Sequence, residues 1–506
     1  MRPSLTYCCF LTIIFCCLCC FGSIQSQEFG VNFNESLHVA NNLKDLKRTE
    51  TTWTKGFFDF FQFYDQPDRL LTDPGLKDFL SLQDHGFKVI LNLKFNFKKR
   101  DFPAIPSEEA TKYQDFLIAV LDQVWGKVDI LVVGNEPFIE SKPTDWNTKL
   151  LPFYQLMAET VQAYRVGKEQ KPIYMGAFNK LYDPSFIAQG TDDLLSYIKN
   201  TPWIAGADIH PHHKTMEEMR LMYEYVNDRI RKDQKIIMTE FSIVWWWKDH
   251  FKNSIPTDFA KTYNYDPQMK NWEYLNHTLE KGIRRSEWVD FLSSSTWFEN
   301  RKRYLKESFD LVTSYPNFHV GTYSYKIGQT SFTANGNPWI FNSLYQIKAI
   351  QPSVEGTAFN YALIDDFWLI ARDLKEVTIF SVATNRKLSF DDKGSITTTK
   401  KRRSSDSSSK WYVYKVGENQ FKLRCSANGY YLAQNRSEKL RLTPNIQDAS
   451  TFQFIERSQG DSIGYIKTID TNLNIRIMEV DTKRKEQVQL SKEEDAFAQW
   501  KIKKLE

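Results

Sequence analysis

Short apolar runs alternate with longer segments of helical period between about residues 28 and 351. The runs are 28–33, 50–58, 88–95, 128–136, 172–179, 206–213, 235–244 and 320–327. Between them, apolar residues recur every three or four positions, as in 113–124. Thr215 and Glu218 have the spacing of a helix N-terminal capping box. Nearly continuous apolar strands separated by helices predict a parallel sheet covered by helices.

The number of runs favours a closed barrel over an open doubly wound sheet. Eight strands over roughly 320 residues suit a (β/α)8 TIM barrel. No glycine-rich phosphate loop follows the first run, which weakens a dinucleotide-binding alternative. The stretch 248–317 is longer than one strand-helix unit needs, so we expect an elaborated seventh connection.

The pattern changes after about residue 351, where short alternating strands and polar turns take over. A short apolar pattern occurs three times, as Trp411-x-Val413, Phe452-x-Phe454 and Trp500-x-Ile502. They are 41 and 48 residues apart. A repeat of this period indicates stacked equivalent units. We therefore predict an all-β domain over 352–506, with a β-trefoil as the best fit.

The first 27 residues have the pattern of a secretory signal peptide. Arg2 precedes the short apolar stretch CCFLTIIFCCLCCF, and small polar residues lead to a cleavage site near Ser26 or Gln27. We expect a secreted or periplasmic protein. A lipid anchor on Cys19 or Cys20, or a retained N-terminal anchor, stays open. No later run is long enough to span a bilayer.

Cysteine content and charge narrow the possibilities further. Six of the seven cysteines lie in the leader, so only Cys425 remains and no internal disulfide can form. Net charge is +4, from 66 basic and 62 acidic residues, which does not point to a nucleic-acid partner. Aromatic content is 15%, and aromatic rings serve sugar faces as well as cores. We expect a monomer.

Two of the predicted strands end in the same way. VVGNE finishes with Glu136, and IIMTE finishes with Glu240. In a (β/α)8 barrel the carboxyl ends of the strands form one shallow bowl, so both carboxylates would point into it. Burying a carboxylate there is costly unless it is paired or hydrogen-bonded, so stability alone hardly explains two of them, whereas a chemical role would. Glycosidic cleavage needs such a pair, and proximity is expected to keep one glutamate protonated.

The tripeptides NEP (135–137) and TEF (239–241) resemble the motifs of clan-A glycoside hydrolases, which are retaining (β/α)8 enzymes. The resemblance covers about residues 28–351. It implies that Glu136 is the acid/base, Glu240 the nucleophile, and Asn135 a ligand of the sugar 2-hydroxyl. It also implies no metal or organic cofactor, and carboxyl groups about 5 Å apart.

Further candidates for binding the sugar lie on or beyond other strands. His210, in the sequence IHPHH, would hydrogen-bond the nucleophile, although His-x-His spacing also suits zinc. Aromatic side chains would stack on sugar rings, and polar ones would bind hydroxyl groups. These candidates are Asn32, Trp53, Lys94, Trp245, Tyr323 and Tyr325. Clan members often carry Trp at the end of strand eight, where this chain has Tyr.

The 352–506 domain resembles ricin-type or fascin-like trefoils, although AQW (498–500) does not match the Q-x-W lectin motif. Sugar binding and a spacer role both stay open for it. The leading hypothesis is a secreted retaining glycoside hydrolase acting on a polysaccharide or oligosaccharide. The alternatives are a non-catalytic carbohydrate-binding barrel with a lectin-like trefoil, and a metallohydrolase that uses the histidines.

Overall fold

The computed structural model describes residues 28–33, 37, 42–354, 356–391, 394–400, 407–457, 463–478 and 486–504. The expected signal segment, residues 1–27, lies outside the described residues. None of the helices in the described ranges combines the length and apolar composition needed to cross a bilayer.

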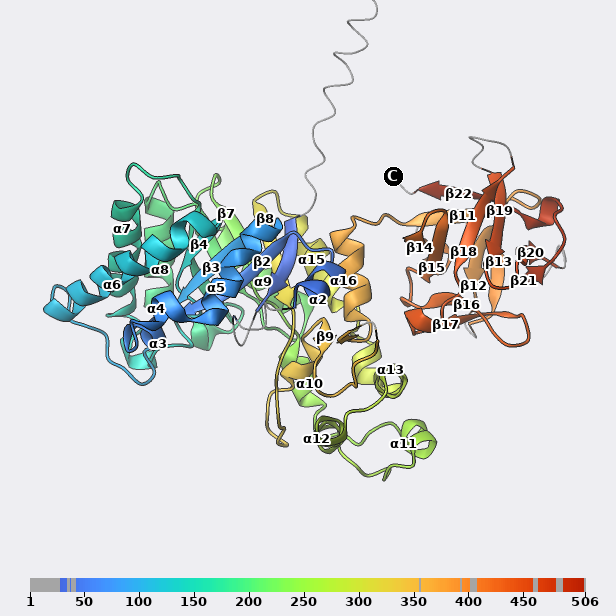
Figure 1. Cartoon of the computed structure of the whole chain (residues 1–506), viewed down its shortest axis with the longest axis horizontal. Coiled ribbons are helices and arrows are strands. Elements are labelled where there is room, and N and C mark those ends of the chain that lie inside the picture. The colour runs from blue at the N-terminus through green and yellow to red at the C-terminus, as the bar shows by residue number, and fades with distance from the viewer. Residues whose placement is uncertain are drawn as a thin grey trace, which may run out of the picture.

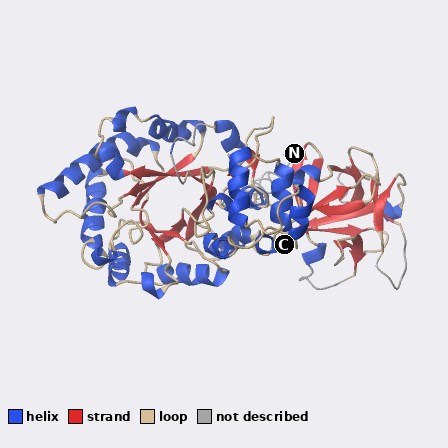
Figure 2. Cartoon of the chain, turned by 90° about the horizontal axis from the view of Figure 1, so that it is seen from below, coloured by secondary structure: helices blue, strands red, loops and turns tan. Residues whose placement is uncertain are grey.

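Eight parallel strands close into a barrel, with β8 pairing back onto β1, as the sequence pattern predicts. Helices surround the ring (Figure 2). The strands are β1 (Glu28–Asn32), β2 (Trp53–Asp59), β3 (Lys88–Lys94), β4 (Ile130–Val133), β5 (Ile173–Asn179), β6 (Gly206–His210), β7 (Lys235–Met238) and β8 (Phe318–Ser324). The predicted runs coincide with these strands, and several run on into the loops at the carboxyl end, where a functional site is expected.

The helices that cover the barrel follow from local signals. In α6, Ser107 caps the N-terminus, and buried side chains recur at helical spacing on one face. Thr215 and Glu218 form the predicted capping box of α9. The covering helices are α2 (Leu43–Arg48), α3 (Phe60–Tyr64), α4 (Arg69–Thr72), α5 (Pro74–Leu80), α6 (Glu108–Val124), α7 (Leu150–Tyr164), α8 (Gln189–Asn200), α9 (Met216–Asn227), α15 (Tyr304–Thr313) and α16 (Leu363–Ala371). Residues of α16 belong to the same buried core as the barrel.

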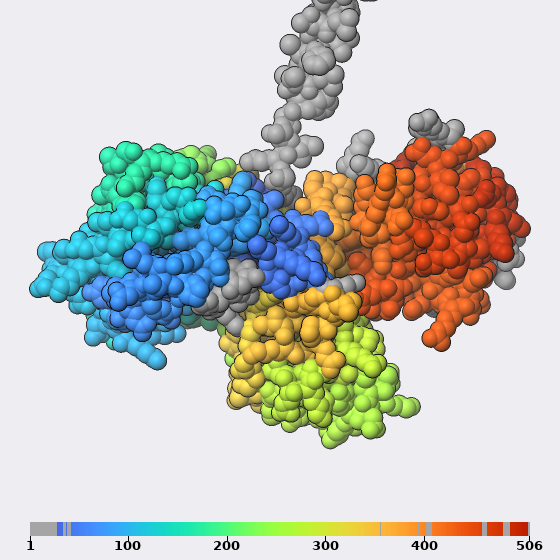
Figure 3. Space-filling model, viewed as in Figure 1, coloured from blue at the N-terminus to red at the C-terminus, as the bar shows by residue number. Residues whose placement is uncertain are grey.

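The connection between β7 and β8 is elaborated, as expected. It contains α10 (Val244–Asp249), α11 (Thr257–Tyr263), α12 (Asn271–Lys281), α13 (Arg285–Ser294) and α14 (Thr296–Glu299). Helices α11 to α13 project as a separate lobe below the barrel in Figures 1 and 3. Trp288 and Trp297 are buried there against Phe341, so these aromatic residues serve packing. A two-stranded sheet, β9 (Tyr345–Gln346) and β10 (Ala358–Phe359), follows β8.

The rest of the chain is an all-β domain with its own core. Its strands are β11 (Val377–Ser381), β12 (Lys387–Phe390), β13 (Ile396–Thr399), β14 (Trp411–Gly417), β15 (Gln420–Cys425), β16 (Tyr431–Gln434), β17 (Leu440–Thr443), β18 (Phe452–Glu456), β19 (Ile463–Thr468), β20 (Asn474–Ile477), β21 (Val488–Ser491) and β22 (Gln499–Lys504). Strands β11, β14, β15, β18, β19 and β22 pair in a ring. The hairpins β12–β13, β16–β17 and β20–β21 accompany the ring. The echoed residues Trp411, Phe452 and Trp500 are fully buried in this core.

A buried charge cluster joins the two domains. Asp366 on α16 accepts hydrogen bonds from Arg424 of β15 at 2.7 Å and from Arg303, next to α15, at 3.0 Å. Asp366 and Arg424 are essentially inaccessible to solvent. The buried carboxylate of Asp366 is therefore paired with one buried and one partly exposed guanidinium group, and its bond to Arg424 links the barrel core to the β-domain.

Candidate functional site

A cavity of about 340 Å³ opens at the carboxyl ends of the barrel strands. Its lining consists of Glu136, Ile139, Asn179, Lys180, His212, Glu240, Trp245, Ile327, Asn337 and Trp339. Both carboxylates at the predicted strand ends therefore face the same space. Below it, an apolar layer fills the barrel interior, formed by Trp53, Ile90, Ile130, Val132, Tyr174, Ile237 and Val320. The interior changes from apolar to charged along the strands.

Glu136 sits on a strained turn after β4. Its φ is +41°, a left-handed conformation that is uncommon for a residue with a side chain. Gly134, at φ +116°, precedes it, and a Cβ there would lie 2.1 Å from the Gly176 carbonyl oxygen. Backbone strain of this kind persists where the surroundings fix a side chain for a task. Here the strain directs Glu136 into the cavity.

Glu240 follows β7 and is held by a lysine from the barrel interior. Lys55 of β2 is fully buried, and its Nζ donates to Glu240 Oε1 at 2.9 Å. Burial acts to raise the pKa of Glu240, but the charges of Lys55 and His210 outweigh it and lower the pKa. Glu240 is therefore an ionised carboxylate, the state a nucleophile requires.

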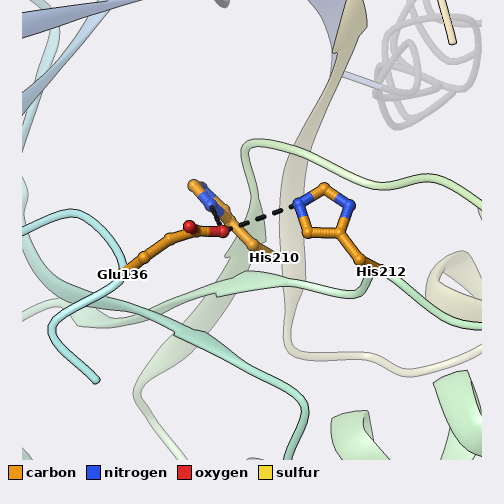
Figure 4. Close-up of side chains that lie close together, drawn as sticks. All are labelled: Glu136, His210 and His212. Carbon is orange, nitrogen blue, oxygen red and sulfur yellow. Dashed lines mark hydrogen bonds and ion pairs between the residues drawn. The ribbon is translucent and has the colours of Figure 1, made fainter. Parts of the chain in front are cut away.

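His210 lies between the two glutamates. Its Nδ1 is 3.2 Å from Glu136 Oε1 and 3.7 Å from Glu240 Oε1. His212 approaches from the same side, with Nε2 3.5 Å from Glu136 Oε1 (Figure 4). Since both carboxylates contact His210 Nδ1, their nearest oxygens are at most roughly 7 Å apart, a limit that includes the ~5 Å separation of retaining glycosidases.

A buried hydrogen-bond chain runs from Asp208 to Glu136. Thr239 Oγ1 is 2.6 Å from Asp208 Oδ2, His210 Nε2 is 2.9 Å from Thr239 Oγ1, and His210 Nδ1 bonds Glu136. Three hydrogen bonds in series need three protons. The Thr239 hydroxyl supplies one and a neutral imidazole one, so the chain holds one further proton, on His210 or on a carboxyl group.

The pKa directions narrow down the position of this proton. Burial acts to lower the pKa of His210, but Glu240, Glu136 and Asp208 outweigh it and raise the pKa. Burial acts to raise the pKa of Glu136, yet hydrogen bonds from His210 and His212 bring it well below its usual range. This corrects the expectation that one glutamate stays protonated. Burial also raises the pKa of Asp208 at the other end of the hydrogen-bond chain, so the further proton lies on His210 or Asp208 and not on Glu136.

Asn135 is hydrogen-bonded to Glu140, a carboxyl group whose pKa is raised. Asn135 Nδ2 donates to Glu140 Oε1 at 2.8 Å, and Lys94 lies 3.4 Å from the same oxygen. Burial raises the pKa of Glu140 to about 8, against the opposing effects of Lys94 and Asn135. The buried Oδ1 atoms of Asn135 and Asn179 have no hydrogen-bond partner among the described residues. Asn179 lines the cavity, whereas Asn135, the predicted ligand of the sugar 2-hydroxyl, is not among its lining residues.

The remaining predicted residues divide into two groups. Trp245 lines the cavity, and so does Trp339. Trp53 does not reach it, because it lies in the apolar layer near the amino end of β2. Tyr323 and Tyr325 share one face of β8, as expected, but that face packs against the covering helices and loops. Tyr323 hydrogen-bonds Tyr304, and Tyr325 donates to the carbonyl of Asn42.

Asn32 lies beneath the cavity, where its Nδ2 donates to the Thr239 carbonyl at 3.0 Å, so it supports the site without lining it. Three functional residues were missed by sequence reasoning: Lys55, Asp208 and Thr239. Each lies inside or directly after a predicted strand. A charged or hydroxyl side chain within an apolar run was the signal that could have identified them.

The same residues form a potential metal-binding set. One ligand atom each of Glu136, His210 and His212 lie within 4.8 Å of one another. A carboxylate and two imidazoles are ligands that zinc accepts. The Thr239–Asp208 pair behind His210 Nε2 also matches the outer hydrogen bonds that orient histidine ligands. The residues fit a cation, although the nearby Lys55 ammonium opposes one electrostatically.

No protein-family model matches the chain, and a search of curated proteins finds no match. Similar solved structures include the designed three-fold symmetric protein ThreeFoil, with 12% identity, 26% of this chain and 99% of that chain covered, and a TM-score of 0.22. A ricin B-like lectin of Macrolepiota procera in complex with lactose has 20% identity, 25% and 94% coverage, and a TM-score of 0.22. A GlcNAcα1-4Gal-releasing endo-β-galactosidase from Clostridium perfringens has 12% identity, 26% and 33% coverage, and a TM-score of 0.22. Scores this low over a quarter of the chain support no assignment of function.

Proposed function

We propose that this protein is a retaining O-glycosyl hydrolase that cleaves a polysaccharide or oligosaccharide. The observation that carries the proposal is the meeting of Glu136 and Glu240, from β4 and β7, on one buried imidazole at the floor of a tryptophan-lined cavity. The resemblance of NEP and TEF to clan-A motifs points to the same two residues.

The chemistry follows from the two carboxylates. Glu240 attacks the anomeric carbon while the glycosidic C–O bond breaks and Glu136 delivers a proton to the leaving oxygen. Water then attacks the anomeric carbon of the Glu240 ester, Glu136 takes its proton, and Glu240 is released. The proton for the first step is stored on His210, because its Nδ1 is hydrogen-bonded to Glu136.

The direct test uses Glu240→Gln in the full chain, with exposed Glu169→Gln as the matched control. We expect Glu240→Gln to lower turnover by at least about a thousandfold, and the control to behave as wild type. NMR should find the product anomer with the configuration of the substrate. A product of inverted configuration, or full activity of Glu240→Gln, would refute the mechanism.

The stored proton has its own test. Thr239→Val removes the hydroxyl group next to His210 Nε2, which should lower the pKa of His210. The alkaline limb of kcat/KM should then move down by about one pH unit. Thr322→Val is the matched control. The Thr322 hydroxyl donates to the Thr239 carbonyl and takes no part in the hydrogen-bond chain from Asp208 to Glu136. Equal profiles for both variants would place the proton elsewhere.

A metallohydrolase is the second candidate, favoured by the grouping of Glu136, His210 and His212. The two functions respond oppositely to chelation. Loss of hydrolysis in EDTA, restored by zinc, would support the metal-dependent function. Hydrolysis that EDTA does not affect would leave the glycosidase proposal standing.

Two further parts of the proposal concern the rest of the chain. The six-strand ring with three hairpins and its threefold echo supports a β-trefoil for the second domain, which could bind sugar or act as a spacer. The leader pattern of residues 1–27 supports secretion. Sequencing the N-terminus of the exported protein tests the latter, with cleavage expected near Gln27.

A further inference from the structure

Two lysine side chains lie around one tryptophan at the cavity. Lys180, directly after β5, lines the cavity, and its Nζ is 4.7 Å from the centre of the Trp245 ring. The Nζ of Lys248 is 5.8 Å from the same ring and donates to Asn337 Oδ1 at 2.8 Å. Trp245 and Asn337 also line the cavity, so Lys248, which contacts both of them, adjoins the cavity that Lys180 lines.

The other lysines of this region have carboxylate partners. Lys55 pairs with Glu240 and Lys94 with Glu140. Among the described residues, no carboxylate lies within ion-pair distance of Lys180 or Lys248. The charges facing Lys180 are those of Asp183 and Glu136, which attract it from farther away, and of Lys248, which repels it.

This arrangement is electrostatically unfavourable for the Lys180 ammonium group. Burial and the neighbouring Lys248 lower the pKa of Lys180, against the effect of Asp183 and Glu136. Lys180 also has a φ of +52°, in the left-handed region. Partial burial and a like charge both disfavour an ammonium group at this position, and an anionic ligand would compensate both.

We propose that Lys180 and Lys248 form a subsite for an anionic substituent, a carboxylate or a sulfate ester, on the sugar bound in the cavity. This inference rests on the proposed function and names its substrate class as acidic glycans. Both amines lie beside the Trp245 ring, and each ammonium group carries three N–H bonds, which can form charge-assisted hydrogen bonds to such a substituent.

Binding measurements test this subsite independently of catalysis. Titration calorimetry on the full chain carrying Glu240→Gln would use three probes of equal length: a uronic-acid oligosaccharide, its carboxyl-reduced neutral form, and a sulfated neutral oligosaccharide. We expect at least one charged probe to bind about tenfold or more tightly than the neutral form at low salt. The preferred charged probe identifies the anion as carboxylate or sulfate.

Lysine variants in the same background assign the effect. Lys180→Met and Lys248→Met should each weaken binding of the charged probe about tenfold and leave neutral binding unchanged, whereas Lys180→Arg should retain most of it. Lys168→Met is the matched control, because Lys168 lies 3.9 Å over the Tyr164 ring outside the cavity. Thermal unfolding of each variant confirms that it is folded.

The outcomes separate this inference from the proposed function. Equal affinity for charged and neutral probes, no binding of any probe, or charged binding that survives both methionine substitutions would overturn the subsite. Hydrolysis of neutral glycans without charge preference would overturn it while preserving the glycosidase. Charge-dependent binding without turnover by the wild type would preserve the subsite and overturn the catalytic proposal.

Discussion

Glu140 gives the sharpest physical prediction, because its carboxyl group is buried beside Asn135 and its pKa is raised to about 8 from an ordinary 4.5. The fold therefore binds this proton more tightly than the unfolded chain does. The associated stability is fully present below pH 4.5 and is lost as the pH rises through about 8. Glu140→Gln keeps the acceptor of the Asn135 hydrogen bond and removes the titration.

The magnitude follows from the two pKa values. At ~1.4 kcal/mol per pH unit, a shift of this size corresponds to at most roughly 5 kcal/mol. The Glu140 Oε2 atom has no partner among the described residues, and relaxation toward solvent would reduce the effect. We expect Glu140→Gln to gain about 2–3 kcal/mol over wild type between pH 5 and pH 9.

Urea unfolding at several pH values measures this difference, and exposed Glu169→Gln is the control. The free energy of unfolding of wild type should decline toward alkaline pH relative to that of Glu140→Gln. A difference between the two proteins that stays constant from pH 5 to pH 9 would refute the buried-acid argument. A Glu140 that Lys94 keeps ionised throughout would give this constant difference, because neither the folded nor the unfolded state would then take up a proton in the range.

Two further variants test the charges on either side of the site. Lys55→Met should raise the pKa of Glu240, so the acidic limb of kcat/KM should move to higher pH. The control is Lys88→Met, which changes a lysine at the amino end of β3 and should leave the acidic limb unchanged. An unmoved acidic limb would mean that Glu240 does not control it. Arg424→Met should destabilise the contact between the domains by about 3 kcal/mol in urea unfolding, because Asp366 keeps only one of its two guanidinium partners. Unchanged unfolding would show that the cluster is not stabilising.

The sequence predicted the barrel and the positions of Glu136 and Glu240 because both depend on strong local signals. Continuous apolar runs define parallel strands. A carboxylate at the carboxyl end of such a run lies at the face of the closed barrel where the strand ends meet. The faces of individual strands were harder to predict. On β8 both faces are buried, so alternation alone did not reveal that Tyr323 points outward while Thr322 points inward to the Thr239 carbonyl.

The distance of an inward-pointing side chain from the cavity was equally hard to predict from the sequence. Trp53 and Lys55 lie two residues apart on β2 and point into the same barrel interior, yet Trp53 fills the apolar layer and Lys55 reaches Glu240. Strand tilt and register, set by pairing with β1 and β3, decide which of the two reaches the cavity. A charged residue within an apolar run marks Lys55 as unusual, but a single sequence contains no direct signal for the register that brings it to Glu240.

The layered interior separates two properties of the site. Asp208, Thr239 and Lys55 lie on barrel strands or at their ends and are hydrogen-bonded to one another or to the glutamates, so the barrel itself fixes the protonation of Glu136 and Glu240. Lys180 and Lys248 lie beyond the strand ends, on a loop and on the inserted helix α10. Substitutions of Asp208, Thr239 or Lys55 should therefore shift the pH profile of cleavage. Substitutions of Lys180 or Lys248 should instead alter which glycan binds. Replacing Lys180 and Lys248 by neutral residues should abolish the preference for acidic over neutral glycans and leave the pH dependence of cleavage unchanged.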